Sequence, residues 1–290
     1  MENLSNIKTV KEILARHGFT FSKALGQNFI INPSVCPRMA EMCGAQKGVG
    51  VLEVGPGIGV LTNELAKNAE KVVAVELDSR LLDILSDTLA EHKNVKIING
   101  DILKIDLHDL IAEEFQGMDV VVCANLPYYI TTPVIMRFLE ERVPVLSMTV
   151  MVQKEAAQRI CAPMGSRSSG AVTAAVNYYS KVKQLFTVSA GSFMPAPKVD
   201  SAVIRLDILN EPAVEALDPH TLFSVIKAAF AQRRKTLPNT LSSGLSVDKA
   251  EIIGLLTDCN IPLNARAEQL TLEQLAQISD ALVRRKNGQN

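Results

Sequence analysis

Residues 49–59 read VGVLEVGPGIG, an apolar run that breaks into closely spaced glycines. The run predicts a buried strand over 49–54, and the pattern from Leu61 to Lys67 predicts a helix directly after the glycines. Strand, glycine turn and helix in this order let a ligand approach the backbone closely, because glycine has no side chain. A tight strand-to-helix connection without a ligand explains such a turn equally well, so its role depends on the neighbouring segments.

The next two predicted strands end in acidic residues. The strand 71–75 runs into Glu76, and the strand 95–98 leads into Gly100-Asp101. An acidic residue in the position of Glu76 can accept hydrogen bonds from both hydroxyls of a ribose, and Asp101 could accept one from an adenine amino group. Together with the turn that holds Gly55 and Gly57, these strand ends predict a site for a ribosyl-adenine group.

Two cofactors contain that group, a dinucleotide and S-adenosylmethionine, and the glycines alone do not separate them. The turn lacks the Gly-x-Gly-x-x-Gly spacing usual for a pyrophosphate. Nothing else in the chain resembles hydride-transfer machinery, so the choice depends on the segment that follows the next strand.

Asn125-Leu126-Pro127-Tyr128 directly follows the apolar run 120–124, where a buried strand ends. The side-chain oxygen of Asn125 and a backbone carbonyl near Pro127 could accept hydrogen bonds from an exocyclic ring amine, while Tyr128 stacks on the ring. A simple turn with a packed tyrosine is the alternative interpretation of these residues alone. Beside a ribosyl-adenine site, an amine clamp favours methyl transfer from S-adenosylmethionine over dinucleotide chemistry.

Nearly the whole chain resembles the ribosomal RNA adenine dimethyltransferase family, in particular its small-subunit members. The matching segments occur in the order usual for the family. They are KALGQNF (23–29), EVGPGIG (53–59), Glu76, Gly100-Asp101, NLPY (125–128), FMPAPKVDS (193–201), FAQRRKTL (230–237) and RAEQL (266–270).

The resemblance implies roles for particular residues. Phe193, which alone would read as a core aromatic, would cover the second face of a flipped adenine, opposite Tyr128. Asn125 to Tyr128 would form the amine clamp. The methyl donor would contact Asn28, the backbone at Ile30, Gly55, Gly57, Glu76, Asp101 and Asn125.

One position departs from the family pattern. The loop 163–170 usually carries an aromatic residue before its second glycine, and here that position is Ser169. A specific aromatic role at this position is therefore in doubt, whereas the family resemblance does not depend on it.

The net charge of −1 is unusual for a protein that binds RNA, but phosphate contact requires only a local basic face. The resemblance favours Arg233, Arg234 and Lys235, in a predicted helix, as that RNA-binding face. The similar run Arg284 to Lys286 is interpreted as a solvated helix face.

Composition limits the other classes of function. Hydrophobic residues make up 47% of the 290-residue chain and charged residues 21%, which is typical of a folded protein. No stretch approaches the roughly 20 apolar residues of a membrane span, and the N-terminus does not resemble a secretory signal, so a cytoplasmic location is expected. The five cysteines include no Cys-x-x-Cys pair and the histidines are scattered, so no metal site is expected.

The spacing of apolar residues alternates along the chain between the patterns of strands and helices, which predicts an α/β fold. Residues 1–45 are expected to form an N-terminal helical segment that contributes to the donor and RNA sites. The pattern predicts a doubly wound and mostly parallel sheet in residues 46–210 and a small helical domain in residues 211–290. The family resemblance implies that the sheet belongs to a Rossmann-like, class I S-adenosylmethionine-dependent methyltransferase domain.

The resemblance implies dimethylation of N6 on two adjacent adenines in a hairpin near the 3′ end of small-subunit rRNA, within a small subunit or an assembly intermediate, by a monomer. Two alternatives remain open. One is the related enzyme type that methylates a single large-subunit adenine, against which the 23–29 and 233–237 segments argue. The other is an assembly factor whose binding matters more than its catalysis.

Overall fold

The structure, a computed structural model, describes residues 4–22 and 25–288. The chain forms two compact units. The first comprises residues 1–157 and 183–208, and the second comprises residues 158–182 and 209–290. Residues 158–182, which the sequence pattern assigned to the methyltransferase domain, thus group with the C-terminal helices.

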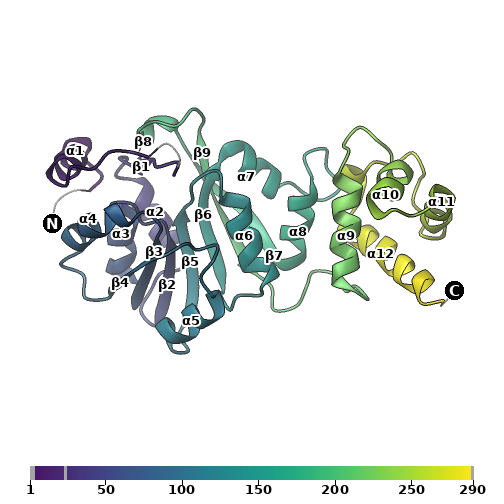
Figure 1. The fold of residues 1–290 in the computed structure, drawn as a ribbon, viewed down its shortest axis with the longest axis horizontal. Helices are drawn as coiled ribbons and strands as arrows, with labels where there is room; N and C mark the ends of the chain where they lie inside the picture. The colour runs from purple at the N-terminus through teal and green to yellow at the C-terminus, as the bar shows by residue number, and fades with distance from the viewer. Residues whose placement is uncertain (1–3, 23–24, 289–290) are drawn as a thin grey trace. The chain divides into compact units, whose positions relative to one another are not determined.

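A seven-stranded sheet lies at the centre of the first unit, in the order β4-β3-β2-β5-β6-β9-β7 (Figure 1). Neighbouring strands are parallel from β4 to β6, and β9 pairs antiparallel with β6. The mostly parallel sheet expected from the sequence is therefore confirmed. The strands are β2 (Val49–Val54), β3 (Lys71–Glu76), β4 (Val95–Asn99), β5 (Asp119–Asn125), β6 (Ser147–Gln153), β7 (Ser180–Val188) and β9 (Ser201–Ile208).

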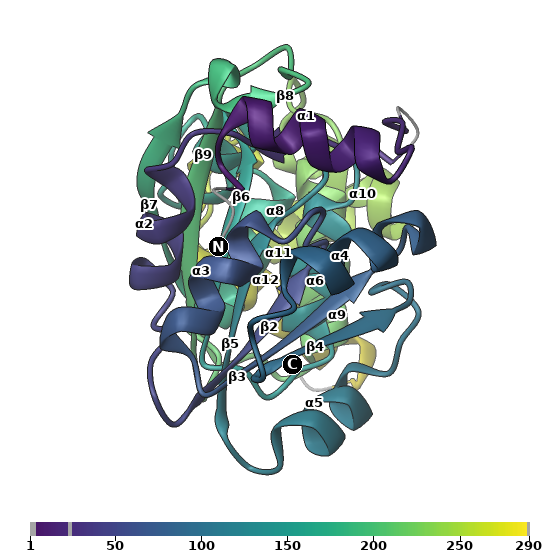
Figure 2. The ribbon, with the colours of Figure 1, turned by 90° about the vertical axis from the view of Figure 1, so that its left-hand side faces the viewer.

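Helices cover both faces of the sheet. Successive strand residues point to opposite faces, so Val51 and Gly50 of β2 face different layers. Val51 is buried in the cluster that α2 and α3 contribute to, whereas Gly50 faces the ring of Phe115 in α5. A Cβ atom on Gly50 would lie 2.2 Å from that ring, so only glycine allows α5 to approach this closely. Figure 2 shows α2 and α3 on one side of the strands.

The helices of the first unit begin with α1 (Ile7–Arg16), α2 (Val35–Met42), α3 (Val60–Asn68), η1 (Ser79–Leu81) and α4 (Leu82–Thr88). They continue with α5 (Leu107–Phe115), α6 (Thr131–Glu140), η2 (Ala190–Ser192) and the start of α7 (Lys154–Ile160).

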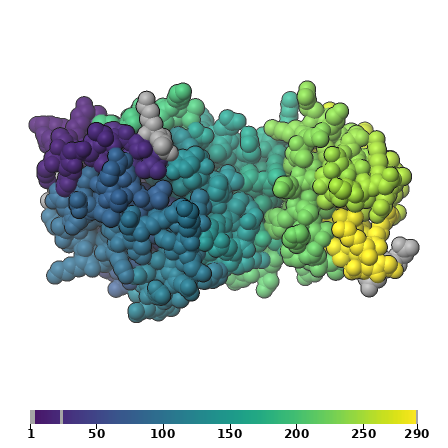
Figure 3. All heavy atoms as spheres, viewed as in Figure 1, coloured from purple at the N-terminus to yellow at the C-terminus, as the bar shows by residue number. Residues whose placement is uncertain are grey.

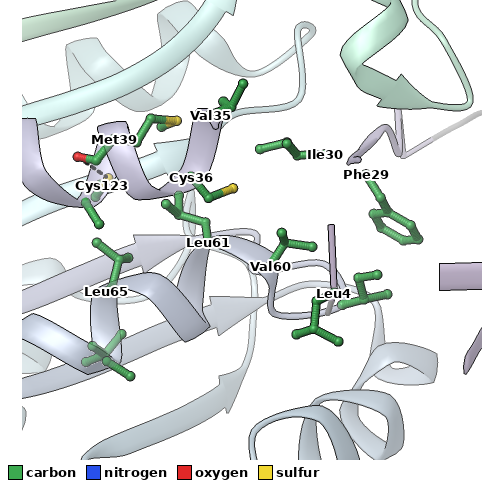
Figure 4. Packing of buried hydrophobic residues seen from close by; sticks show 14 of the residues in the cluster. Leu4, Phe29, Ile30, Val35, Cys36, Met39, Val60, Leu61, Leu65 and Cys123 are labelled. Atoms are coloured by element: carbon green, nitrogen blue, oxygen red, sulfur yellow. Dashed lines mark hydrogen bonds between the residues drawn. The ribbon is translucent and has the colours of Figure 1, made fainter. Parts of the chain in front are cut away.

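The layer between the sheet and α2–α3 is closely packed (Figure 4). Cys36 and Met39 of α2 meet Leu61 and Leu65 of α3, and all four side chains are buried. Cys123 of β5 is also fully buried and directs its thiol toward the Met39 carbonyl oxygen, 4.0 Å away. The thiol therefore fills apolar space in the core, as free cysteines on buried strands usually do.

Within the first unit, the N-terminal helix α1 lies beside α4, as the purple and blue atoms in Figure 3 show. Arg16 of α1 forms a 3.0 Å ion pair with Asp87 of α4. Further along, β1 (Phe29–Ile30) pairs antiparallel with β8 (Phe193–Met194), so Ile30 lies opposite Phe193. This pairing joins segments that lie far apart in the sequence.

The second unit is helical. It contains α8 (Ala171–Tyr179), α9 (Pro219–Phe230), α10 (Leu237–Leu245), α11 (Lys249–Asp258), η3 (Ala267–Gln269) and α12 (Leu272–Lys286). Tyr179 of α8 and Phe223 of α9 stack with ring centroids 5.5 Å apart. The helices expected within residues 211–290 are present as α9 to α12. None of the described helices combines the length and apolar character that a membrane crossing requires.

The prediction that Arg233, Arg234 and Lys235 lie in a helix is wrong. These residues lie in the turn between α9 and α10, where Lys235 N donates to Gln232 O over 3.0 Å. The reason is Pro238, which in a continuous helix would clash with the carbonyl of Arg234 and would lack a hydrogen to donate to it. A proline is tolerated in the first turn, so α10 begins anew at Leu237.

Candidate functional site

A pocket lies at the carboxyl ends of the central strands of the first unit, where α/β sheets bind ligands. It contains about 1020 Å³ of space outside protein atoms, including solvent at its mouth. The turns after β2, β3, β4 and β5 line it, together with residues 25–30. The predicted donor and clamp residues all line this pocket, namely Asn28, Ile30, Gly55, Gly57, Glu76, Asp101, Asn125, Leu126, Pro127, Tyr128 and Phe193.

The glycine turn brings bare backbone to the pocket wall. Gly55 and Gly57 have φ values of +68° and +61°, which disfavour any other residue. A Cβ atom on Gly55 would meet nothing within 4 Å, so open space lies beside it. On Gly57 it would lie 3.1 Å from the ring of Phe29, which packs on the turn from the N-terminal segment.

Glu76 ends β3 with only 6% of its surface exposed. Its Oε1 accepts a 2.8 Å hydrogen bond from Asp78 N, and its Oε2 accepts a 3.2 Å bond from Gly57 N. Burial raises the pKa of this carboxyl, although these backbone donors oppose the rise. Each oxygen keeps a lone pair, so the carboxylate can accept two further hydrogen bonds from a ligand.

Asp78 links the N-terminal segment to the end of β3. Its Oδ2 accepts a 2.6 Å bond from Arg80 and a 2.7 Å bond from the Gln27 side chain. The hydrogen bond from Arg80 lowers the pKa of Asp78, so this carboxyl is ionised. It lies next to Glu76, whose pKa is raised. Gln27 thereby fixes the neighbouring Asn28 at the pocket wall.

Asp101 follows β4 on the same side of the pocket. Its Oδ1 accepts a 3.0 Å bond from Leu103 N, and its side chain remains 28% exposed. Leu77, also at the wall, is 47% exposed although it is apolar. Leu77 and the nearby Ile102 offer apolar surface for a flat ring, a feature that sequence reasoning missed. An apolar residue directly after the acidic strand end is the signal that could have indicated it.

Glu53 is a second buried acid in the pocket lining, at the end of β2. It is 1% exposed, and its Oε2 has no hydrogen-bond partner among the described residues. Burial, together with the nearby Glu76 carboxyl, raises the pKa of Glu53 to about 8. At neutral pH the carboxyl is therefore mainly protonated, which the sequence pattern did not indicate.

The clamp residues leave β5 in a turn closed by a 3.1 Å bond from Ile130 N to Pro127 O. The Asn125 Nδ2 donates to the backbone oxygen of Asn28 over 3.3 Å. This bond occupies the amide nitrogen and leaves Asn125 Oδ1 as an acceptor. The Pro127 carbonyl also accepts from Thr131 Oγ1 at 3.3 Å, so it is committed to the turn.

Two aromatic side chains complete the pocket. The Tyr128 hydroxyl lies 2.8 Å from Ser201 Oγ at the start of β9, and burial raises its pKa. Phe193 is 4% exposed and is held by the β1–β8 pairing. Ile31 N donates to Ser192 O over 2.8 Å and closes the same connection. Ser201 therefore anchors the Tyr128 ring, and the pairing with β1 holds the Phe193 backbone.

The predicted segment 23–29 is only partly described. Lys23 and Ala24 lie outside the described residues. Leu25 to Phe29 line the pocket.

The basic residues Arg233, Arg234 and Lys235 are exposed in the second unit and are not part of the pocket lining. Arg233 Nη2 donates to the backbone oxygen of Arg167 over 2.9 Å, which brings another exposed cation beside the turn. Ser169 is buried and its hydroxyl contacts Ser166 O at 2.7 Å and Glu268 O at 3.2 Å. At the family's aromatic position, Ser169 thus forms a polar link between the 163–170 loop and η3.

Comparisons with known proteins agree with this geometry. A family-wide sequence profile described as ribosomal RNA adenine dimethylase matches residues 18–283. The ribosomal RNA small subunit methyltransferase A of Alkaliphilus oremlandii is 47% identical over 98% of this chain and 100% of its own length. The protein of the same name from Bacillus mycoides is 45% identical over 99% of each chain.

Solved structures extend the likeness to the fold. A dimethyladenosine transferase from Plasmodium falciparum matches with a TM-score of 0.73 at 23% identity, over 90% of this chain and 98% of its own. The 23S rRNA methyltransferase ErmE matches with a TM-score of 0.67 at 25% identity, over 88% of this chain and 99% of its own.

Proposed function

The chain belongs to the ribosomal RNA adenine dimethylase family, and from this premise we propose that it dimethylates two adjacent adenines in a hairpin near the 3′ end of small-subunit rRNA. The methyl groups come from S-adenosylmethionine and are transferred to N6 of each adenine. The relatives at 45–47% identity carry a small-subunit name, which supports this substrate over a large-subunit adenine.

One observation carries the proposal. Residues singled out in six separate parts of the sequence, from Asn28 to Phe193, line one pocket beside the strand ends. The proposed donor site and the proposed amine clamp would therefore share one cavity, as a transfer between two bound groups requires.

The pocket residues fit S-adenosylmethionine. Glu76 would hold the ribose hydroxyls, Asp101 the adenine amino group, and Leu77 with Ile102 the faces of the adenine ring. The open backbone at Gly55 and the side chain of Asn28 would hold the amino-acid part. When bound, the donor supplies an electrophilic methyl group on a sulfonium centre.

The clamp would present the adenine amine to that methyl group. Asn125 Oδ1 and the carbonyl of Leu126 would accept the amine hydrogens, since the Pro127 carbonyl already serves the turn. Tyr128 and Phe193 would stack on the two faces of the base after it leaves its helix. Neither Asn125 nor Leu126 titrates, so positioning and electrostatics carry the catalysis and the released N6 proton passes to water.

The exposed cations of the second unit would bind RNA phosphates. Arg233, Arg234 and Lys235 share one turn, and Arg167 lies beside it. Such contacts give affinity without reading sequence, which suits recognition of folded rRNA in a small subunit or an assembly intermediate.

The proposal includes a monomer, because the donor and clamp residues all come from one chain. It includes no metal, because a sulfonium methyl group is electrophilic without a Lewis acid. The cytoplasm is the proposed location, because bacterial small subunits are assembled there.

Mapping of radiolabelled methyl groups tests the function. Purified protein is incubated with labelled donor and with small or large ribosomal subunits, and the modified nucleotides are located. We expect dimethyladenosine at two adjacent small-subunit positions. Label confined to one large-subunit adenine would instead support an enzyme of the type that methylates large-subunit rRNA. The similar structure ErmE is named as a 23S rRNA methyltransferase.

A further inference from the structure

Tyr129 directly follows the proposed clamp and behaves differently from Tyr128. The turn closed by Ile130 N and Pro127 O places these two tyrosines at its central positions. Tyr128 is anchored to Ser201, whereas 54% of Tyr129 is exposed at the mouth of the pocket. The two adjacent rings therefore lie in different surroundings, with Tyr128 inside the pocket and Tyr129 at its rim.

The exposed ring lies beside Gly26. A Cβ atom on Gly26 would lie 3.5 Å from both Cδ1 and Cε1 of Tyr129, so the space between this edge of the ring and the Gly26 backbone is no wider than a methyl group needs. The same atom would lie 3.7 Å from Pro127 Cβ, so Gly26, Pro127 and Tyr129 are neighbours at the rim. A tyrosine ring presents a stacking surface with little loss of conformational freedom on binding, because few side-chain torsions have to be fixed.

A base-flipping reaction creates a use for such a surface. When one base leaves its stack, the next base in the strand loses a stacking partner. Aromatic side chains replace that loss, because every base offers a π face. A single exposed apolar residue needs no explanation elsewhere on a surface, but this one borders the cavity proposed to hold the flipped base.

We propose that Tyr129 is a second base-stacking residue, which holds the unpaired nucleotide next to the target adenine at the rim of the pocket. This inference rests on the proposed function and adds to it. The ligand is an unpaired RNA base, preferably a purine. With two adjacent target adenines, the base on Tyr129 would be the second target while the first occupies the clamp.

The test compares Tyr129→Ala, Tyr129→Phe and Leu146→Ala. Leu146 is a matched control, since it is 53% exposed and does not line the pocket. RNA carrying 2-aminopurine beside the target adenine reports stacking through quenched fluorescence. Donor affinity and the methylation rate at saturating RNA are measured on the same proteins.

We expect Tyr129→Ala to weaken RNA binding about tenfold and to relieve the 2-aminopurine quenching. Donor affinity should change less than about twofold, and Tyr129→Phe should behave as the wild type because it keeps the ring. A Tyr129→Ala protein that matches Leu146→Ala in binding and in quenching would overturn the inference. A wild-type protein that does not methylate small-subunit rRNA would instead overturn the proposed function.

Discussion

The side-chain amide nitrogen of Asn125 lies 3.3 Å from the backbone oxygen of Asn28, across 97 residues of sequence. This hydrogen bond joins the N-terminal segment to the end of β5. It also sets the orientation of the Asn125 side chain, because an amide that donates through nitrogen presents its oxygen elsewhere. The acceptor proposed for the adenine amine is thus positioned by a residue proposed to contact the methyl donor.

Asn125→Ala should lower the single-turnover methylation rate by ~100-fold or more, comparable to removal of one group that stabilises charge in a transition state. RNA affinity should change little, since stacking and phosphate contacts remain. Rapid-quench measurements at saturating donor separate the chemical step from donor binding. A near-normal rate would exclude Asn125 from the clamp.

Ser201→Ala removes the partner 2.8 Å from the Tyr128 hydroxyl and should loosen that ring without removing it. We expect the methylation rate at saturating RNA to fall roughly tenfold, because misplacement of the stacked base lowers the fraction aligned for transfer. Tyr128→Phe lacks the same hydrogen bond and serves as the matched comparison. Should the two variants differ widely, Ser201 would act through something other than Tyr128.

Glu76→Ala should weaken donor binding by roughly 1.5–3 kcal/mol, the usual contribution of hydrogen bonds to a charged group. Glu140→Ala, which removes an exposed acid outside the pocket, is the control. Titration calorimetry measures both variants. Unchanged donor affinity in Glu76→Ala would remove this residue from the donor site.

Donor affinity should also depend on pH through Glu76. Its pKa is raised by burial, so acidification protonates it at a higher pH than an ordinary glutamate. The protonated group is a weaker acceptor for ribose hydroxyls, and binding therefore weakens as the pH falls through that raised pKa. Glu76→Gln should bind weakly without this pH dependence.

The sequence predicted the pocket well because its wall is made where apolar strands end. Glu76 and Asn125 directly follow or complete such runs, and parallel strands bring their carboxyl ends to the same edge. At these strand ends, the local sequence pattern is therefore enough to indicate where a residue lies in the folded protein. The N-terminal contribution of Asn28 came instead from family resemblance, since no periodicity indicates that this segment reaches the sheet edge.

Other features depend on contacts that local pattern does not encode. The helix assigned to Arg233 to Lys235 ignored the effect of Pro238 four residues after Arg234. The link between Ser201 and Tyr128 joins segments 73 residues apart, so neither residue indicates the other. The grouping of residues 158–182 with the C-terminal helices likewise depends on packing, including the stacking of Tyr179 on Phe223.

Glu53 should make the first unit less stable as the pH rises. Its pKa is about 8 in the folded protein and that of an ordinary glutamate when unfolded, so the unfolded chain binds fewer protons between these values. The free energy of unfolding, compared with Glu53→Gln, should fall by up to about 1.4 kcal/mol per pH unit from about pH 5 to 8. Above about pH 8 the difference should level off.

Urea unfolding of donor-free protein at several pH values measures this difference. Glutamine resembles the protonated acid and cannot ionise, so it isolates the contribution of Glu53. Parallel pH profiles for the two proteins would show that the Glu53 carboxyl is not held in its protonated form.

Replacement of Arg233, Arg234 and Lys235 by alanine should weaken RNA binding and make its salt dependence shallower. Each lost phosphate contact removes one released counterion, so the slope of log K against log salt should drop by up to roughly 0.7–0.9 per contact. Donor affinity should not change, because these residues are not part of the pocket lining. Filter binding to small subunits at several salt concentrations gives the slope.

Two further variants separate charge from structure. Changing only Arg234 and Lys235 preserves the hydrogen bond from Arg233 to Arg167 O and should produce about two-thirds of the slope change of the triple variant. Replacing Arg284 and Lys286, which are exposed on α12, is the control and should leave the slope near the wild-type value, while Arg285 keeps its pairing with Asp258. If the triple variant kept the wild-type slope and wild-type activity on subunits, the turn would be a solvated surface and RNA would be bound elsewhere.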